Sequence, residues 1–514
     1  MKKSLRIISL FLCALLVLPT AVNAAGGVYL KESGTAYSII NPYENVDWST
    51  VKAYKTALHT HTNASDGDPT LKESIERHVE TGFDIVATTD HGTVNYSWAE
   101  NSENKFIYNV MKIIGRSEGD LVYLGSEGSF DNGMQYALKT ENGDDYLTVD
   151  GEKRIMRVPY GIEQNAVSVN AHVNSWFVDY HDNSITTYSD AIKGVEKAGG
   201  VCVINHPGEY TKARYELHSA DAYNPANFNY WYHINKFASL LNKYDRCIGI
   251  DINSKGDDRT RFDRVLWDKL LMRFTPNGKN VFAICSSDAH QLDKIDTGFV
   301  IALLPQQTSS ALSSALLNGE FFGGSHCIGN YEELVQIASA LKEYYGETDL
   351  YKEVNSKAEE MATRVHLIEI GELEPDSSVG VTYKVLDDEG YCTAATQPEI
   401  TSVNVDKENG VITVNSENAL LVRWISDGEL VATTTSENAS FNLAEYSGKI
   451  GSYIRAEVFG EGGVLYTQPF IINGGASAVK IVDSGFFDFG VFDFLIGVFH
   501  NWFEIISRFF SNLF

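Results

Sequence analysis

Short apolar runs alternate with longer polar or helix-like stretches between residues 52 and 325. The runs have the length of buried strands, and several of the stretches between them carry apolar residues at helical spacing. The strand-like runs are Ala53–Leu58, Phe83–Thr88, Leu121–Gly125, Val167–Ala171, Val201–Ile204, Cys247–Ile250 and Val281–Cys285. The helix-like stretches include Leu71–Glu80, Asp190–Ala198, Tyr232–Leu241 and Arg261–Leu271. Strands that alternate with helices predict an α/β fold, built as a parallel sheet or as a β/α barrel.

One segment breaks this rhythm, and the pattern changes again after the barrel-like region. Residues 131–165 contain the turn pairs Asn142-Gly143 and Asp150-Gly151, which are typical of tight hairpins and predict a β insertion. Residues 331–364 are expected to be helical. From 365 to 475, short alternating segments separated by glycine-containing turns predict a small all-β sandwich domain.

The first residues have the layout of a secretory signal peptide. Basic residues precede an apolar run from Ile7 to Leu18, and small residues follow up to Ala24. We therefore expect residues 1–24 to be removed and 25–51 to form a lead-in segment. The mature protein is then secreted, and it is either extracellular or associated with the cell surface.

The last segment, 476–514, is rich in phenylalanine. Its apolar residues recur at steps of three and four, which predicts an amphipathic helix. They are Phe492, Leu495, Ile496, Phe499, Phe503, Ile506, Phe510 and Leu513. We expect residues 486–514 to attach to the envelope surface or to self-associate, because an apolar face of this size is unstable in water. Docking of the helix on the protein itself is the alternative.

Composition narrows the range of functions. The chain has 514 residues, of which 44% are hydrophobic and 21% charged, so it is globular and larger than one domain. Its formal net charge is −27, which argues against a broad surface that binds nucleic acid. A small phosphorylated substrate is still compatible with this charge, because bound cations can invert the local field.

Histidines and carboxylates stand at or just after the ends of these runs. His59 and His61 end the first run, and the i, i+2 spacing lets both face one ion. The third run leads into the carboxylate Glu127. The remaining members of the set are Asp66, His91, His172, His206, Asp288 and His290. Strand ends converge on one face of a β/α barrel, and imidazole with carboxylate suits zinc, manganese or iron. The set exceeds what one ion needs, so we expect two or three divalent ions.

The order of these motifs resembles the PHP (polymerase and histidinol phosphatase) superfamily. The motifs are HxH followed by SDG, then TDH, GxE, a lone histidine, NHPG and SDAH. The match covers about residues 52–325, and we predict the barrel domain at 52–330. The resemblance implies a distorted barrel of seven β/α units that binds up to three metal ions and mostly hydrolyses phosphate esters. The sequence beyond the barrel is similar to a secreted branch with a C-terminal β-sandwich.

The resemblance also implies how the ligands divide among the ions. His59, His61, Glu127 and Asp288 would hold one ion, and Glu127 would bridge to a second ion at His172 and His206. Asp66, His91 and His290 would hold a third ion. Glu127, Asp288 and His206 are the expected catalytic residues.

Further residues are expected to support the site. Asp90 is a candidate to orient a ligand imidazole, and it could equally be a turn carboxylate. Lys255 and Arg259 are candidates for binding substrate. We therefore expect a secreted metal-dependent phosphoesterase that acts on a phosphomonoester or a small phosphodiester, in the manner of a nucleotide phosphatase or a 5′–3′ exonuclease. The alternatives are a carboxyl- or carbamate-ester hydrolase that uses the same metals, and a non-enzymatic surface-attachment protein.

Overall fold

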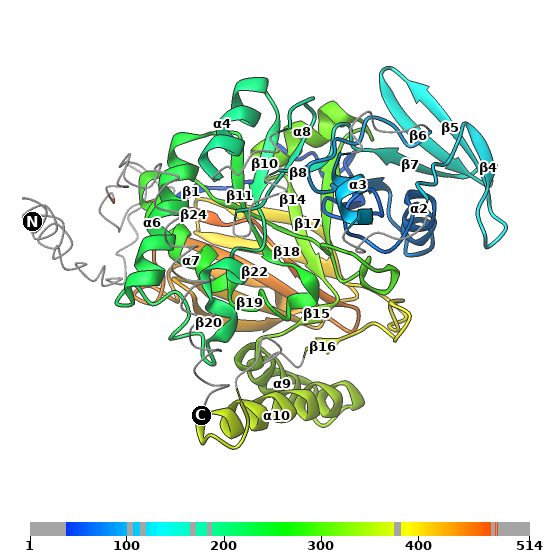
Figure 1. The fold of residues 1–514 in the computed structure, drawn as a ribbon. Helices are drawn as coiled ribbons and strands as arrows, with labels where there is room; N and C mark the ends of the chain where they lie inside the picture. The colour runs from blue at the N-terminus through cyan, green and yellow to red at the C-terminus, as the bar shows by residue number, and fades with distance from the viewer. Residues whose placement is uncertain are drawn as a thin grey trace, which may run out of the picture.

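The chain folds into several β-sheets with helices packed around them (Figure 1). The computed structural model describes residues 37–99, 106–113, 120–164, 171–181, 188–374 and 382–473, together with Val479 and Ile481. The expected signal peptide and the phenylalanine-rich helix at 486–514 lie outside the described residues. Within the described part of the chain, no helix is both long and apolar enough to cross a membrane.

A five-stranded sheet positions some of the histidines and carboxylates that were predicted at strand ends. Its order is β12-β11-β10-β9-β8, with β10, β11 and β12 parallel and the other pairs antiparallel. The strands are β8 (Ile162–Gln164), β9 (Val173–Trp176), β10 (Val201–Ile204), β11 (Cys247–Asn253) and β12 (Phe282–Cys285). β9 to β11 are buried along their whole length, and β10 and the first residues of β11 accordingly appear in the sequence as apolar runs. β9 contains Asn174 and Ser175 and was not predicted, and most of the predicted run Val167–Ala171 lies outside the described residues.

A 14-stranded sheet positions the other predicted histidines and carboxylates. Strand β2 (Lys52–Ala57) pairs in parallel with β3 (Ile85–Val86), and β3 pairs in parallel with β7 (Lys153–Arg157). On the other side of β2 the sheet continues through antiparallel β13 (Gly298–Leu304) and β14 (Phe321–Ser325). The mixed directions show that the strands do not follow a regular parallel β/α pattern.

Two isolated parallel bridges join the two sheets. Thr60 pairs with Ala289 just beyond β2 and β12, and His91 pairs with Glu163 beyond β3 and within β8. Both bridges lie where strands end. They bring the ends of strands from the two sheets together at one place.

Helices cover the outer faces of these sheets. α2 begins at a capping box, in which the Thr70 hydroxyl accepts from the Glu73 backbone N–H and the Glu73 carboxylate accepts from the Thr70 N–H. The helices beside the sheets are α2 (Leu71–Glu80), α3 (Phe106–Ile113), α4 (Tyr188–Ala198), α5 (Pro207–Thr211), α6 (Phe228–Lys243), α7 (Asp263–Phe274) and α8 (Ser309–Asn318). The most extensive apolar cluster lies between the five-stranded sheet and α4, α6 and α7, and it buries Trp267, Phe237 and Leu270.

The segment at 131–165 forms hairpins as its turn residues indicate. Asn142 and Gly143 both have positive φ (54° and 93°), as a type I′ turn requires, and they join β5 (Gln135–Glu141) to β6 (Asp144–Val149). With β4 (Glu127–Ser129), these strands extend the large sheet outward past β7 (Figure 1). The run at Leu121–Gly125 is not a strand, because strand pairing begins only at Glu127.

The helical segment after the sheets consists of two helices that lie side by side below the sheets (Figure 1). They are α9 (Tyr331–Tyr345) and α10 (Asp349–Glu369). Asn330 and Thr348 cap their N-termini through side-chain hydrogen bonds.

The C-terminal β strands are divided between a sheet of their own and the 14-stranded sheet. β17 (Glu399–Asp406), β18 (Val411–Glu417) and β21 (Ser440–Asn442) make a separate three-stranded sheet. The other strands join the 14-stranded sheet, because β23 pairs antiparallel with β14. They are β19 (Leu421–Ser426), β20 (Glu429–Thr435), β22 (Tyr453–Gly460), β23 (Gly463–Tyr466) and β24 (Phe470–Asn473), with β1 (Ser38–Ile40) at the edge.

A buried histidine stands next to this junction. His326, directly after β14, donates from Nδ1 to the Gly462 carbonyl oxygen at 2.7 Å, and its Nε2 is 3.4 Å from Asp296 Oδ2. Burial lowers the pKa of His326, but the Asp296 carboxylate outweighs it and raises the pKa to about 9. The folded protein therefore holds this proton more tightly than an unfolded chain, in which a histidine has a pKa of about 6.5.

This difference predicts how stability depends on pH. The contribution of His326 is complete below about pH 6.5 and is lost as pH rises through about 9, and it amounts to about 3 kcal/mol. We expect the free energy of unfolding in urea, measured between pH 6 and pH 9.5, to decline less with pH in His326→Gln than in the unmodified protein. His366→Gln, at an exposed histidine of α10, is the control and should follow the unmodified protein. An unchanged pH slope in His326→Gln would contradict the assignment.

Candidate metal centre

Eight of the nine predicted ligands meet where the bridges join the two sheets. His59 and His61 follow β2, His91 follows β3, and Asp288 and His290 follow β12. His172 precedes β9, His206 lies between β10 and α5, and Asp66 lies in the turn after His61. A ninth member, Glu163 on β8, was not predicted.

The first group of donor atoms lies at the bottom of the site. Nε2 of His59 and Nε2 of His61 are 3.2 Å apart. Asp288 Oδ1 is 3.2 Å from the first nitrogen and 3.1 Å from the second. Glu163 Oε2 is 3.5 Å and 3.2 Å from the same two atoms. All four side chains are at most 1% exposed.

A second group is centred on Asp66. Its Oδ1 is 3.3 Å from His290 Nε2 and 3.7 Å from both His61 Nδ1 and His91 Nε2. His61 therefore belongs to two groups, with one ring nitrogen facing each. The side chains of Asp66 and His290 are 18% and 31% exposed, so this side of the site is open.

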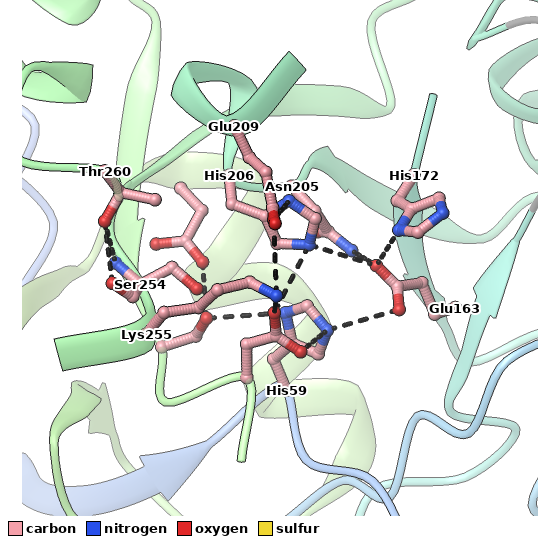
Figure 2. A network of polar contacts seen from close by, with 12 residues as sticks. His59, Glu163, His172, Asn205, His206, Glu209, Ser254, Lys255 and Thr260 are labelled. Carbon is pink, nitrogen blue, oxygen red and sulfur yellow. Dashed lines mark hydrogen bonds and ion pairs between the residues drawn. The ribbon is translucent and has the colours of Figure 1, made fainter. Parts of the chain in front are cut away.

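A third group surrounds the other oxygen of Glu163 (Figure 2). Glu163 Oε1 is 3.2 Å from His172 Nδ1 and 3.4 Å from His206 Nε2. Its Oε2 is 3.1 Å from His91 Nδ1. Glu163 thus contacts imidazoles on both carboxylate oxygens, which is the arrangement of a bridging ligand.

The donor atoms fit divalent cations. Glu163 Oε2 and Asp288 Oδ1 are buried and accept no hydrogen bond, although ring nitrogens surround both. A buried carboxylate oxygen without a donor is unfavourable unless a cation compensates it. Nitrogen and oxygen donors without thiolate suit zinc, manganese or iron. Three overlapping groups of this kind are present, so the residues fit two or three ions.

The protonation states favour the same interpretation. Burial alone would raise the pKa of Glu163, but the imidazoles of His91 and His172 hold it well below its ordinary value. Burial also lowers the pKa of His91 to about 3. Near neutral pH the carboxylate is therefore ionised and the imidazole is neutral, which are the forms that bind metal. At His61 burial lowers the pKa, but the adjacent Asp288 and Glu163 carboxylates outweigh it and raise the pKa well above the ordinary value. A bound cation would take the place of that proton.

Buried polar groups behind the ligands hold them in position. Asp90 accepts from the Ser65 hydroxyl at 2.8 Å, and Ser65 Oγ is 3.3 Å from His61 Nδ1. Asp90 also accepts from the backbone N–H of Thr62 at 2.7 Å, so it supports the turn as well as the ligand. The two roles considered for Asp90 are thus combined in one side chain.

Two further contacts were not predicted from the sequence, although Asn205 belongs to the NHPG motif. Asn205 donates to Glu163 Oε1 at 2.6 Å. The Ser286 hydroxyl lies 3.4 Å from His59 Nδ1 and donates to Asp251. Burial raises the pKa of Asp251 to about 8. Such contacts fix the orientation of ligand side chains and are commonly as important as the ligands.

The structure corrects the prediction for Glu127. This residue is exposed on β4, in the outward hairpin region, and belongs to none of the three groups. The pattern GxE occurs a second time, at Gly161-Ile162-Glu163, and this copy enters the site. A Cβ atom at Gly161 would collide with the carbonyl oxygen of Thr88, so glycine lets β8 approach the end of β3. Strand pairing, rather than the motif alone, selects Glu163.

Of the two predicted substrate-binding residues, Lys255 lies in the site. Its Nζ is 2.7 Å from Asp288 Oδ2 and 3.2 Å from Glu209 Oε2 (Figure 2). Burial lowers its pKa, but the Asp288 and Glu209 carboxylates outweigh this and raise it, so the side chain is a cation. Arg259 is 42% exposed and pairs with the other oxygen of Glu209 at 2.8 Å. Glu209 therefore lies between Arg259 and the groups of candidate ligands.

An unusual loop presents Lys255. Lys255, Gly256 and Asp257 all have positive φ (51°, 64° and 66°), which costs about 1–3 kcal/mol at each non-glycine residue. The Asp257 carboxylate accepts two hydrogen bonds of 2.9 Å from buried Arg264. Glu333 on α9 accepts two more from the same guanidinium at 2.9 and 2.8 Å. Buried ion pairs thus hold the strained loop in place.

This geometry makes a prediction about Glu163. Glu163→Gln removes the charge between the imidazole groups and should weaken metal binding by at least about 10- to 100-fold. Metal content after dialysis, measured by inductively coupled plasma mass spectrometry, should fall by at least one ion per chain. Glu127→Gln is the matched control and should keep its full content. Loss of ions from Glu127→Gln but not from Glu163→Gln would refute the assignment.

Comparisons with known proteins identify similar solved structures only. No family model and no curated protein matches this chain. A two-domain protein from Bacteroides vulgatus, described as containing a predicted PHP-like metal-dependent phosphoesterase, is 13% identical with a TM-score of 0.34. The match covers 88% of this chain and 92% of that one.

Two other structures are similar over shorter parts. A lesion-specific endonuclease from Pyrococcus furiosus is 12% identical with a TM-score of 0.28, covering 52% of this chain and 56% of its own. An amidohydrolase from Chromobacterium violaceum is 12% identical with a TM-score of 0.22, covering 46% of this chain and 87% of its own. Because all three TM-scores are below 0.5, we base the function on the site itself. In its ordered motifs this chain resembles the PHP superfamily, and a PHP-like protein is among the solved structures similar to it.

Proposed function

We propose that this protein is a metal-dependent hydrolase of PHP type that cleaves a phosphoric ester. The observation that carries the proposal is the convergence of three buried or partly buried donor groups around Glu163, His61 and Asp288. Such a set is larger than a structural metal site needs, and it keeps an open side. Divalent cations bound there would lower the pKa of water and neutralise phosphoryl oxygens.

The exposure of the residues indicates where substrate enters. His59, His61 and Glu163 close the bottom of the site and exclude water from it. The side chains of His172 and Lys255 are 14% and 24% exposed and lie at the rim. Asp66 and His290, at 18% and 31%, are also accessible. A substrate that enters there therefore meets an ammonium group, imidazoles and the Asp66 carboxylate before it reaches the buried carboxylates of Glu163 and Asp288.

The charge of the site supports an anionic substrate. The three groups contain the carboxylates Asp66, Glu163 and Asp288. Two or three divalent cations carry more positive charge than these carboxylates carry negative charge. Lys255 adds a positive charge and Glu209 offsets it, so the surplus comes from the cations. A phosphoric ester compensates this surplus, whereas a neutral carboxyl or carbamate ester does not.

Of the three expected catalytic residues, Asp288 and His206 keep their roles. Glu163 replaces Glu127 as the carboxylate between the imidazoles. Asp288 contacts His206 Nε2 at 3.5 Å and Lys255 Nζ at 2.7 Å through the same oxygen, Oδ2. It therefore sets the imidazole and the ammonium toward each other. We assign Glu163, Asp288 and His206 to holding and orienting the reacting groups, and Lys255 to binding the phosphoryl group.

The proposal is tested by measuring metal content and hydrolysis together on the full chain. We expect two or three ions per chain, and release of nitrophenol from p-nitrophenyl phosphate or bis-p-nitrophenyl phosphate that a chelator abolishes and zinc, manganese or iron restores. Release from p-nitrophenyl acetate alone would favour the carboxyl-ester alternative. Full metal content without hydrolysis of any ester would favour the alternative of a non-enzymatic surface-attachment protein.

Lys255 supplies a second prediction. Lys255→Gln should lower kcat/KM for the phosphoric ester about 10- to 100-fold, because a charge-assisted contact to the phosphoryl group is lost. Metal content should be unchanged. Lys279→Gln removes a solvent-accessible ammonium that pairs with Asp245, and it should leave kcat/KM unchanged. Equal activity of Lys255→Gln and the unmodified protein would exclude Lys255 from the site of substrate binding.

A further inference from the structure

Tyr210 lies at the rim of the metal centre but belongs to none of the ligand groups. It is on α5, four residues after His206, which precedes the first residue of this short helix. Its ring centroid is 5.4 Å from that of His206 and 5.3 Å from that of His172. The residue is half-buried rather than fully enclosed.

The hydroxyl group points toward the ligand atoms. Tyr210 Oη is 2.8 Å from His172 Nδ1, the nitrogen that also lies 3.2 Å from Glu163 Oε1. In Figure 2, this nitrogen is the one joined to the Glu163 carboxylate. The Tyr210 hydroxyl and the carboxylate therefore share one side of the imidazole. Once the lone pair of Nδ1 binds a cation, it no longer accepts a hydrogen bond from Tyr210.

Tyr210 remains a donor under these conditions. A tyrosine hydroxyl has an ordinary pKa of about 10 and therefore keeps its proton near neutral pH, so Tyr210 is a phenol. A phenol next to a group of ligands can donate a hydrogen bond to an anionic oxygen without carrying charge itself. A donor already held in position is effective where negative charge develops during a reaction.

We propose that Tyr210 is a catalytic residue whose hydroxyl donates a hydrogen bond to a phosphoryl oxygen of the substrate on the His172 side of the centre. This inference rests on the proposed function. The ring, packed between His172 and His206, fixes the direction of the hydroxyl. No proton is transferred, and the hydrogen bond strengthens as the oxygen gains charge.

The backbone supports this placement. His206 has φ 23° and ψ 57°, outside the helical region, and Pro207 then begins α5. Lys212 ends the helix in the left-handed conformation, with φ 67°. The turn between these two residues projects His206, Glu209 and Tyr210 toward the site. Glu209 Oε2 is 3.5 Å from His206 Nδ1, and Tyr210 packs on the same imidazole.

The test compares Tyr210→Phe with the unmodified protein in two measurements. The first is kcat with the phosphoric ester that the unmodified protein hydrolyses, which should fall about 10- to 100-fold. The second is binding of inorganic phosphate to the metal-loaded protein by isothermal titration calorimetry, which should weaken about 5- to 20-fold. Metal content and the thermal midpoint should be unchanged, because phenylalanine keeps the ring between the imidazoles.

A matched control removes another buried hydroxyl near α5. Tyr223 Oη is 2.7 Å from Thr211 Oγ1 and 3.1 Å from Asp263 Oδ1, outside the ligand groups. Tyr223→Phe should keep kcat and phosphate affinity even if its stability falls.

The outcomes separate this inference from the function on which it rests. Unchanged kcat and phosphate affinity in Tyr210→Phe, with an active unmodified protein, would overturn the role of Tyr210 alone. Loss of metal content in Tyr210→Phe, with normal phosphate affinity once metal is restored, would show that Tyr210 merely orients His172 and would also overturn the proposal. If the metal-loaded unmodified protein hydrolyses no phosphoric ester, the proposed function fails first.

Discussion

Two carboxylates, Glu163 and Asp288, lie almost completely buried among imidazole rings, and the architecture around them has to compensate their charge. Each faces ring nitrogens at 3.1–3.5 Å. Burying an ionised carboxylate is costly unless a positive charge lies nearby. Protons on imidazole provide part of this charge, and cations would provide more. The bridges that join the two sheets exist at the same place, so sheet closure and charge compensation depend on each other.

The layers behind the ligands make this arrangement rigid. Asp90 reaches His61 through Ser65, and Asp251 reaches His59 through Ser286. The loop at Lys255 is strained, and it is held by ion pairs that extend to α9. Strain of this kind persists only where the surroundings over-determine the backbone. The helical pair, which has no ligands of its own, therefore contributes to the site through the position of one lysine.

The sequence predicted most ligands because each follows directly from a local pattern. His59 and His61 need only the alternation of a strand, and Asp288 needs only its place after a strand. Glu163 could not be distinguished from Glu127 in this way, since both stand in GxE and the choice depends on which strand pairs with the end of β3. Tyr210 had no signal either, because its role depends on packing against His172, 38 residues away in the chain.

The fold was predictable to the level of alternating strands and helices, and the strand directions were not. β8 and β9 each run antiparallel to the next strand of the five-stranded sheet, and neither was among the predicted apolar runs. The junction of β14 with β23 joins residues about 140 positions apart, and it depends on backbone pairing that no local pattern encodes. The expected separate sandwich is for this reason partly merged with the sheet of the metal centre.

That junction has a consequence for how the chain can be divided. β14 has β13 on one side and β23 on the other, so the C-terminal strands satisfy its outer row of N–H and C=O groups. A chain that stopped before β17 would expose this row, with Phe321 and Phe322 beside it, as a free and largely apolar edge. Free edges of this kind recruit strands from other molecules. The C-terminal strands therefore protect the edge of β14 from pairing with strands of other molecules. A shortened chain without these strands would be prone to aggregation.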